Sequence, residues 1–330
     1  MNILDIFNDD AFGVNTLTAA VNNQDYKPGR IGELGIFEEQ GVNTTTISVE
    51  VQDNVLSLVD VAPRGARGAL LDKKPRAVLP FMIPHLPQGD TLMADSLQNV
   101  RAFGTADQLQ GVQQVVNDRL FSMARKNEYT LESHRVAAVQ GKYFDAAGNQ
   151  NSIYTAFGVS EPVVKMGLTV ETTELRNKCT EVIDIIEEAL GGLSYSRLHV
   201  LCGKGFWAQL IVHPTIKETY LNQSEAKALR GDGRETFEFG GLTFERYNGT
   251  QHVKIEANEA RAFPVGVMDF FLTRFAPANY VETVNTPGLP YYAKTEVMKF
   301  GKGVELEVQS NPLNICTRPK ALVRLKHTAT

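Results

Sequence analysis

The strongest candidate for chemistry is a glycine-rich hexapeptide, GKGFWA at residues 203–208, which has the spacing G-x-G-x-x-A. It follows an apolar run at 198–202 that predicts a buried strand, and a helix is predicted over 206–211. Glycines between a strand and a helix let a pyrophosphate approach the amide groups at the helix N-terminus. The Gly203-Lys204-Gly205 turn therefore supports one enzymatic hypothesis, a nucleotide-binding enzyme.

Two further features of a dinucleotide site are missing around this turn. Such a site has an acidic residue about twenty positions on, at the end of the next strand. Here the residues that follow predict a helix and then a polar loop. Phe206 and Trp207 are bulky for a phosphate-binding turn, and they suit a helix that packs on a sheet. We therefore favour a structural strand-to-helix turn and expect no bound cofactor.

The other residue types that perform chemistry form no recognisable site. The six histidines are scattered, and none has the spacing of a zinc ligand set. The sequence contains neither a G-x-x-x-x-G-K-[ST] phosphate loop nor a G-x-S-x-G elbow. Asp184, Glu187 and Glu188 lie on one predicted helix, where they are most simply its solvated face. We expect no catalytic residue and no metal site.

Composition narrows the class of protein. The 330 residues, 43% of them hydrophobic, suffice for two compact domains or for one domain with extensions. A net charge of −5 argues against a dedicated nucleic-acid binder, which needs a basic excess to neutralise phosphates. We expect Cys179, Cys202 and Cys316 to be buried free thiols in a reducing compartment.

The sequence also predicts where the protein resides. No run of about eighteen apolar residues predicts a membrane span. Residues 1–10 contain three aspartates and no basic residue, which is not the pattern of a secretory signal. We expect a protein that stays in the cytoplasm where it is made, unless a larger assembly carries it out.

Two predicted regions have an unusual shape. Apolar residues alternate over 47–51 and recur over 78–83, which predicts two strands joined by a long, basic, glycine-rich tip at 62–76. A two-stranded ribbon is marginal in water unless it lies on another surface. From about 106 to 140, apolar residues recur every three or four positions, so we expect a helix of roughly 50 Å unless it breaks near Asn127-Glu128.

The rest of the chain mixes helices and strands, so the predicted fold class is α+β. Residues 1–40 predict an arm that contains a short helix ending at Asn22-Asn23 and that needs a partner to become ordered. The remaining predicted elements are a hairpin with strands at 142–144 and 153–157, a helix at 173–190, strands over 237–247 followed by a hairpin turn at Asn248-Gly249, and strands at 304–308 and 321–325.

Two stretches of the chain carry long motifs of unusual composition. The first reads FMIPHLP at 81–87 and ADSLQNVRAFG at 94–104; the second reads GKGVELE at 301–307, QSNPL at 309–313 and TRP at 317–319. These stretches resemble the major capsid protein E family, the lambda-type shell proteins of tailed phages. The family's first motif is similar to IPHIP…ADEIQ-x-VRAFG, and Ser96 and Leu97 are the main departures. The resemblance covers residues from about 12 to 326.

The resemblance implies a Hong Kong 97-type phage capsid fold. It places an N-terminal arm at 1–43, an extended E-loop ribbon at 44–88, a peripheral domain with a spine helix at 89–159, an axial domain at about 160–290, and C-terminal strands shared between these two domains at 291–330. The implied function is that of a major head protein, which self-assembles into the icosahedral shell around the double-stranded DNA genome of a tailed bacteriophage.

The resemblance also implies partners and an interface. The expected partners are other copies of the chain in hexamers and pentamers, scaffolding, portal and decoration proteins, and packaged DNA contacted non-specifically; no membrane is expected. The protein would be part of the virion and would assemble in the host cytoplasm. The expected subunit-interface residues gather at the ribbon tip: Arg64, Gly65, Arg67, Gly68, Lys73, Lys74 and Arg76. We expect no covalent crosslink there.

Overall fold

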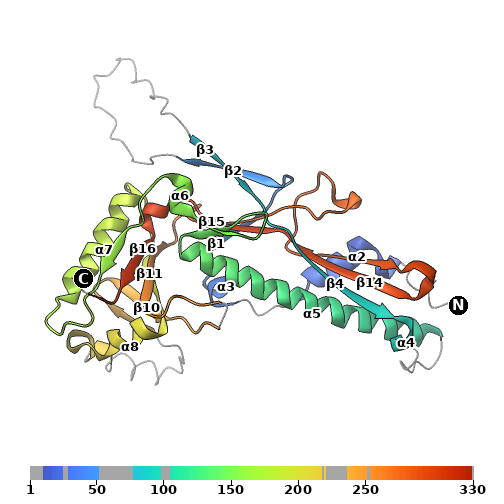
Figure 1. Cartoon of the computed structure of the whole chain (residues 1–330), viewed down its shortest axis with the longest axis horizontal. Helices are drawn as coiled ribbons and strands as arrows, with labels where there is room; N and C mark the ends of the chain where they lie inside the picture. Colours follow the sequence, from blue (N-terminus) through green and yellow to red (C-terminus); the bar gives the residue numbers. More distant parts are fainter. Residues whose placement is uncertain are drawn as a thin grey trace, which may run out of the picture.

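One long helix runs along much of the long axis of the molecule (Figure 1). In the computed structural model, which describes residues 10–24, 29–51, 77–97, 105–217, 219–220, 236–250 and 253–328, α5 spans Thr105–Val139. Its 35 residues correspond to about 50 Å at 1.5 Å per residue. The predicted long helix is confirmed, and it continues through Asn127-Glu128 without a break.

A narrow antiparallel sheet lies along the N-terminal half of α5. Its strand order is β13-β14-β4, with bounds Tyr292–Val297, Gly303–Ser310 and Leu86–Met93. Val304 and Leu306 of β14 point inward and form a core with Leu120 of α5. The short helix α4 (Ala94–Leu97) follows β4. The apolar stripe that the sequence predicts on the long helix is therefore buried against this sheet.

The N-terminal segment packs on the same chain. A 3-10 turn η1 (Asp10–Phe12) leads into α2 (Val14–Asn22), which lies against β13 and α5 with Leu17 and Val21 buried. α3 (Arg30–Leu34) packs on α5, and β1 (Phe37–Gly41) pairs in parallel with β12. The predicted short helix is confirmed. The expectation that the segment needs a partner to become ordered is wrong for these described residues.

The end of the molecule away from the narrow sheet is a larger lobe, which is built on a six-stranded sheet. Its order is β7-β16-β11-β8-β10-β9, with bounds Val163–Lys165, Val323–Lys326, Glu259–Val265, Arg197–Cys202, Leu242–Arg246 and Thr236–Phe239. Five consecutive residues of β8 are buried, so both faces of this strand are covered. Helices α7 (Leu175–Leu190) and α8 (Lys204–Val212) contribute apolar side chains to the same core. The cysteines are free and buried, as predicted.

A second three-stranded sheet connects the two ends. Its order is β1-β12-β15, with β12 at Phe271–Phe275 and β15 at Pro312–Cys316. Because β15 begins two residues after β14 ends, one stretch of chain runs from the narrow sheet into this connecting sheet. The remaining 3-10 turns are η2 (Val281–Thr283), η3 (Lys299–Gly301) and η4 (Pro319–Ala321).

Two predicted hairpins differ from the structure. After β5 (Lys142–Phe144), the returning strand is β6 (Gln150–Ser152), and residues 153–157 form the helix α6 (Ile153–Phe157). Five apolar-rich residues do not distinguish a strand from one helical turn. Among the described residues, Asn248-Gly249 does not lead into a strand that pairs with β10, whose partners are β8 and β9.

Candidate assembly surfaces

A two-stranded ribbon leaves the body of the molecule near its middle (Figure 1). β2 (Thr46–Val51) pairs in antiparallel register with β3 (Ala77–Met82), as the sequence predicts. The residues between them, 52–76, lie outside those that the structure describes. They include every interface residue predicted from the sequence, so these remain predictions: Arg64, Gly65, Arg67, Gly68, Lys73, Lys74 and Arg76.

The base of the ribbon is anchored by aromatic contacts. Val49 and Phe81 are buried on its inward face. The ring of Phe81 meets that of Tyr143 edge to face, with centroids 5.0 Å apart, and stacks on Phe157 at 6.3 Å. The opposite face of β3 is open, with Met82 60% exposed. The ribbon therefore has a fixed origin on its own subunit and a free apolar face.

The glycine-rich turn before α8 is filled by the protein's own chain. The amide of Gly203, and that of Phe206 in the first turn of α8, donate hydrogen bonds of 2.9 and 2.8 Å to main-chain carbonyls within 256–259. A Cβ atom at Gly203 would lie 2.0 Å from a carbonyl oxygen of that segment, and one at Gly205 would lie 2.4 Å from the Asn258 side chain. The segment occupies the place where a phosphate would bind. The nucleotide-binding hypothesis is therefore wrong, and the structural turn is confirmed.

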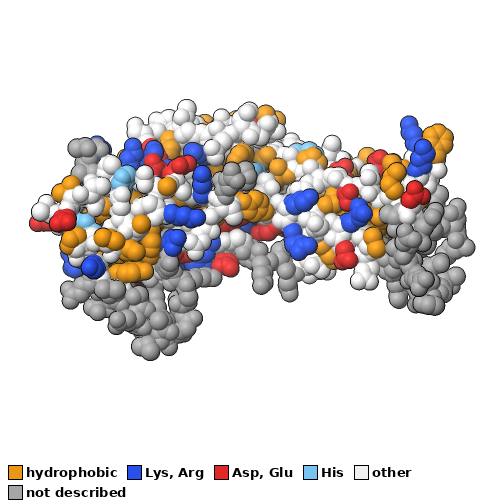
Figure 2. Space-filling model, turned by 60° about the horizontal axis from the view of Figure 1, so that its bottom comes forward, with side chains coloured by type: hydrophobic (Ala, Val, Ile, Leu, Met, Phe, Trp, Pro, Cys, Tyr) orange, Lys and Arg blue, Asp and Glu red, His pale blue; other side chains and the backbone are white. Residues whose placement is uncertain are grey.

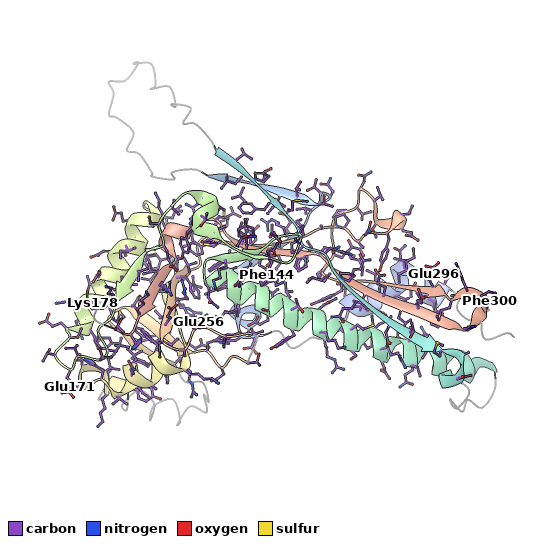
Figure 3. The ribbon with its side chains drawn as sticks, in the orientation of Figure 1. Phe144, Glu171, Lys178, Glu256, Glu296 and Phe300 are labelled. Carbon is purple, nitrogen blue, oxygen red and sulfur yellow. The ribbon has the colours of Figure 1, made fainter. Side chains whose placement is uncertain are left out.

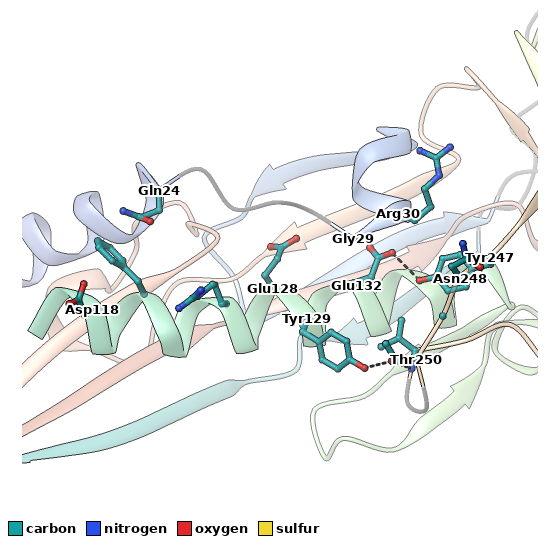
Figure 4. A pocket seen from close by; sticks show the side chains of 14 residues that line it. Gln24, Gly29, Arg30, Asp118, Glu128, Tyr129, Glu132, Tyr247, Asn248 and Thr250 are labelled. Carbon is teal, nitrogen blue, oxygen red and sulfur yellow. Dashed lines mark hydrogen bonds between the residues drawn. The ribbon is translucent and has the colours of Figure 1, made fainter. Parts of the chain in front are cut away.

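A buried carboxylate fixes the N-terminal segment to α5. The side chain of Glu132 accepts hydrogen bonds from the amides of Ile31 and Gly32, at 2.8 and 3.2 Å, at the start of α3. It also accepts one of 3.1 Å from the Tyr247 hydroxyl (Figure 4). An acidic group at a helix N-terminus satisfies amides that have no partner within the helix. Glu132 thus joins α3, α5 and the end of β10.

A second buried carboxylate lies beside this junction. Arg30 binds both oxygens of Glu245 through Nε and Nη2, with 2.8 Å between Nη2 and Oε2, and His199 Nε2 lies 3.1 Å from Oε2. Burial alone would raise the pKa of the Glu245 carboxyl, but the hydrogen bonds and charges of His199 and Arg30 outweigh it and lower the pKa to about 2. The carboxylate is therefore held in its charged form.

A hollow lies over this junction, lined by Gln24, Gly29 and Arg30, by α5, and by residues 247–250 and 253 (Figure 4). Its volume is about 800 Å³, and its lining includes Asp118, Arg125 and Glu128. Among the residues that the structure describes, no group of three His, Cys, Asp or Glu side chains could hold a metal ion. The hollow is therefore lined by both acidic and basic side chains, and its described residues do not form a metal site.

The outer surface of the body is mixed in character. Figure 2 shows acidic and basic side chains interspersed along one elongated face, with hydrophobic side chains between them. No helix within the described ranges has the length and apolar character needed to cross a membrane.

The elongated body, with its long helix and projecting ribbon, is matched by known proteins. The family described as phage major capsid protein E covers residues 13–327 of the chain. The chain belongs to this family.

Individual relatives agree with that assignment. The major capsid protein of Salmonella phage Felix O1 (isolate Felix O1-VT1) is 26% identical over 95% of both chains. That of Pseudomonas phage KPP10 is 27% identical over 90% of this chain and 92% of the relative. A solved structure assigned as a prophage capsid protein from Escherichia coli CFT073 superposes with a TM-score of 0.60 at 14% identity, covering 95% of this chain and 98% of the other. The predicted Hong Kong 97-type α+β fold and major capsid function are confirmed.

Sequence reasoning missed the charged junction around α3. Arg30 and Glu245 are 215 positions apart, and Glu132 is about a hundred positions from the amides it binds. The only local signal was the acidic residue itself on the predicted long helix. A single sequence gives no means of pairing it with α3.

Proposed function

We propose that this member of the phage major capsid protein E family forms hexamers and pentamers of an icosahedral shell around a double-stranded DNA genome, with its ribbon as a strap onto neighbouring subunits. The observation that carries the proposal is the ribbon itself. Its base is held by Phe81, one face is open at Met82, and a 25-residue connection, 52–76, extends the chain between its strands.

A strap of this kind suits a shell. A two-stranded ribbon is marginal in water without a surface to lie on, and a neighbouring subunit supplies that surface. Each subunit would give one ribbon and receive another. Modest contacts that recur in every subunit then add through multivalency.

The proposed contacts are made by the basic residues of the tip. Arg64 and Arg67 stand next to glycines in the sequence, and we propose that they meet carboxylates of the next subunit, with Lys73, Lys74 and Arg76 adding positive charge. A single exposed ion pair contributes only about 0–1 kcal/mol. The same pair repeated around a shell has a larger effect on assembly.

The remaining roles follow from this architecture. In this proposal residues 1–43 form the N-terminal arm, 44–88 the ribbon, 89–159 the peripheral domain, 160–290 the axial domain, and 291–330 strands shared by both domains. The chain works as a structural protein without a catalytic step. It contacts scaffolding, portal and decoration proteins during assembly in the host cytoplasm. Its net charge of −5 suits an inner wall that touches packaged DNA without gripping it.

Deletion of residues 62–76 tests the strap. We expect the deleted subunit to keep the circular dichroism spectrum of a folded protein and to form no shells in sedimentation or electron microscopy. A variant with a Gly/Ser segment of equal length in the same place separates the effect of tip chemistry from that of chain length. Shells of normal yield from the deletion would contradict the proposal.

A further inference from the structure

The hairpin between β13 and β14 carries an exposed aromatic side chain at the end of the molecule. Phe300 is 92% exposed, and Figure 3 shows it at the end opposite the lobe that carries Lys178. The Lys302 ammonium lies 5.9 Å from its ring centroid, at the outer limit of a cation–π contact. We call Lys299–Gly301 together with Lys302 the hairpin tip.

The backbone of the tip gives no reason for a phenylalanine. Phe300 has φ 64° and ψ 14°, and Gly301 also has a positive φ of 63°. Two successive left-handed residues in a hairpin turn favour asparagine or aspartate followed by glycine. An aromatic residue at the first of these positions is strained by its Cβ atom. The turn by itself therefore does not account for an aromatic side chain at this position.

A second apolar protrusion belongs to η2, which lies beside β13, because Glu282 of η2 pairs with Lys294. Val281 of η2 is 88% exposed, and Val284 just after it is 63% exposed. The loop is held in place from within, because the hydroxyl of buried Thr283 donates a hydrogen bond of 2.7 Å to the Ala278 carbonyl. A loop that is already ordered loses little entropy when a partner binds.

The sheet face beside η2 is acidic. Tyr280 precedes η2 and borders a hollow of about 470 Å³ whose lining includes Glu296, Glu305 and Glu307. Glu296 lies directly opposite Glu305 in the β13–β14 register, and like charges in that arrangement destabilise a sheet. With Glu282 of η2, this surface holds five carboxylates, those of Asp90, Glu282, Glu296, Glu305 and Glu307. Two cations face them: the Lys294 ammonium pairs with Glu282 at 2.9 Å, and the Arg119 guanidinium pairs with Asp90 at 2.8 Å.

The hairpin tip complements both the apolar side chains of η2 and the acidic face beside it. It presents one exposed ring for apolar contact, and its two lysines carry the charge opposite to the excess of carboxylates on the acidic face. We propose that the hairpin tip of one copy of the chain seats on η2 of a second copy, with Phe300 against Val281 and Val284 and the tip lysines facing the carboxylates. Tip and receptor are different surfaces, so the contact is head to tail and closes into a ring where copies are related by rotation. The inference rests on the proposed function, because it needs a shell of many copies.

One substitution separates the effect of the Phe300 side chain on assembly from its effect on the stability of the hairpin turn. Phe300→Asn suits the turn, so the isolated subunit should melt at the wild-type temperature or above it. The subunit concentration needed for shell formation should rise about tenfold, equivalent to about 1.4 kcal/mol per contact. Phe300→Tyr keeps the ring and should assemble close to the wild-type threshold. An unchanged threshold for Phe300→Asn, with shells still forming, would overturn this contact and leave the proposed function intact.

Cross-linking tests the position of the contact. The native cysteines are all buried, so a bis-maleimide added to shells of a Lys299→Cys/Val284→Cys variant, which keeps the Phe300 ring, should join only the engineered sites. We expect covalent chains of several subunits, and monomers only from Val284→Cys alone. Monomers only from the double variant would show that the tip does not bind at η2. A cross-link from Val284→Cys to Arg67→Cys in their place would assign η2 to the ribbon and would also overturn the inference.

Discussion

Arg30→Met should lower the free energy of unfolding of the unassembled subunit by about 3 kcal/mol at pH 7. The guanidinium of Arg30 is the bidentate partner of Glu245, whose side chain is 4% exposed. Removal of one partner of a buried ion pair costs about 3–5 kcal/mol, because the other charge stays buried. The lower end applies, since Arg30 is itself 22% exposed and His199 remains 3.1 Å from the carboxylate.

The same substitution should change the response to acid. The fall in the pKa of Glu245 from 4.5 to about 2 corresponds to about 3 kcal/mol of stability. A carboxyl with a lowered pKa contributes this stability in full above its unfolded pKa, and the contribution is lost as the pH falls from about 4.5 to about 2. Without Arg30 the pKa rises, so the variant should lose less stability than the wild type over this range.

Urea unfolding followed by circular dichroism at pH 7 and pH 3 measures both effects. Arg30→Lys is the matched control, because it keeps the charge and loses the bidentate geometry, and it should fall between wild type and Arg30→Met. Arg30→Met combined with Glu245→Gln should recover part of the loss. A change within about 0.5 kcal/mol at pH 7, as at an ordinary surface site, with an unaltered acid response would refute the coupling of these side chains.

Three further variants probe other elements. Leu120→Ala, at a buried site on α5, should cost about 2–5 kcal/mol in urea denaturation, whereas Gln114→Ala on the exposed side of α5 should stay within about 0.5 kcal/mol. Gly203→Ala should lower the melting temperature, because its Cβ atom would lie 2.0 Å from a carbonyl oxygen. An unchanged melting temperature would show that the backbone of the turn shifts at no cost to accommodate the added atom. Reversal of Arg64 and Arg67 to Glu should raise the assembly threshold at low salt and have less effect at high salt, and equal thresholds at low salt would show that both are solvated.

The sequence by itself determined the elements whose signals are local. The stripe on α5, the alternation in β2 and β3, and Gly191-Gly192 after α7 depend on residues within a few positions of one another. Side-chain period and helix-ending glycines act at that range, so these elements could be predicted. The family motifs added the capsid fold, because they are long and specific.

Local signals were insufficient where neighbouring strands decided the outcome. The dipeptide Asn248-Gly249 favours a hairpin turn, yet β10 takes β8 and β9 as its partners. Residues 153–157 form α6 because Ile153 and Tyr154 are buried against the connecting sheet β1-β12-β15. The Tyr154 hydroxyl also donates a hydrogen bond of 3.0 Å to the Leu322 carbonyl. Five residues carry too little periodicity to overrule such packing.

Only the tertiary structure decided which distant groups meet. It placed α3 against α5, so that Glu132 binds the amides of Ile31 and Gly32 and Arg30 reaches Glu245. It also placed Phe300, for which the sequence gives no special signal, in the turn of a hairpin, where its side chain is exposed and its φ is positive. Burial, charge pairing and exposure depend on the whole folded surface, and a linear pattern of residue types does not contain that information.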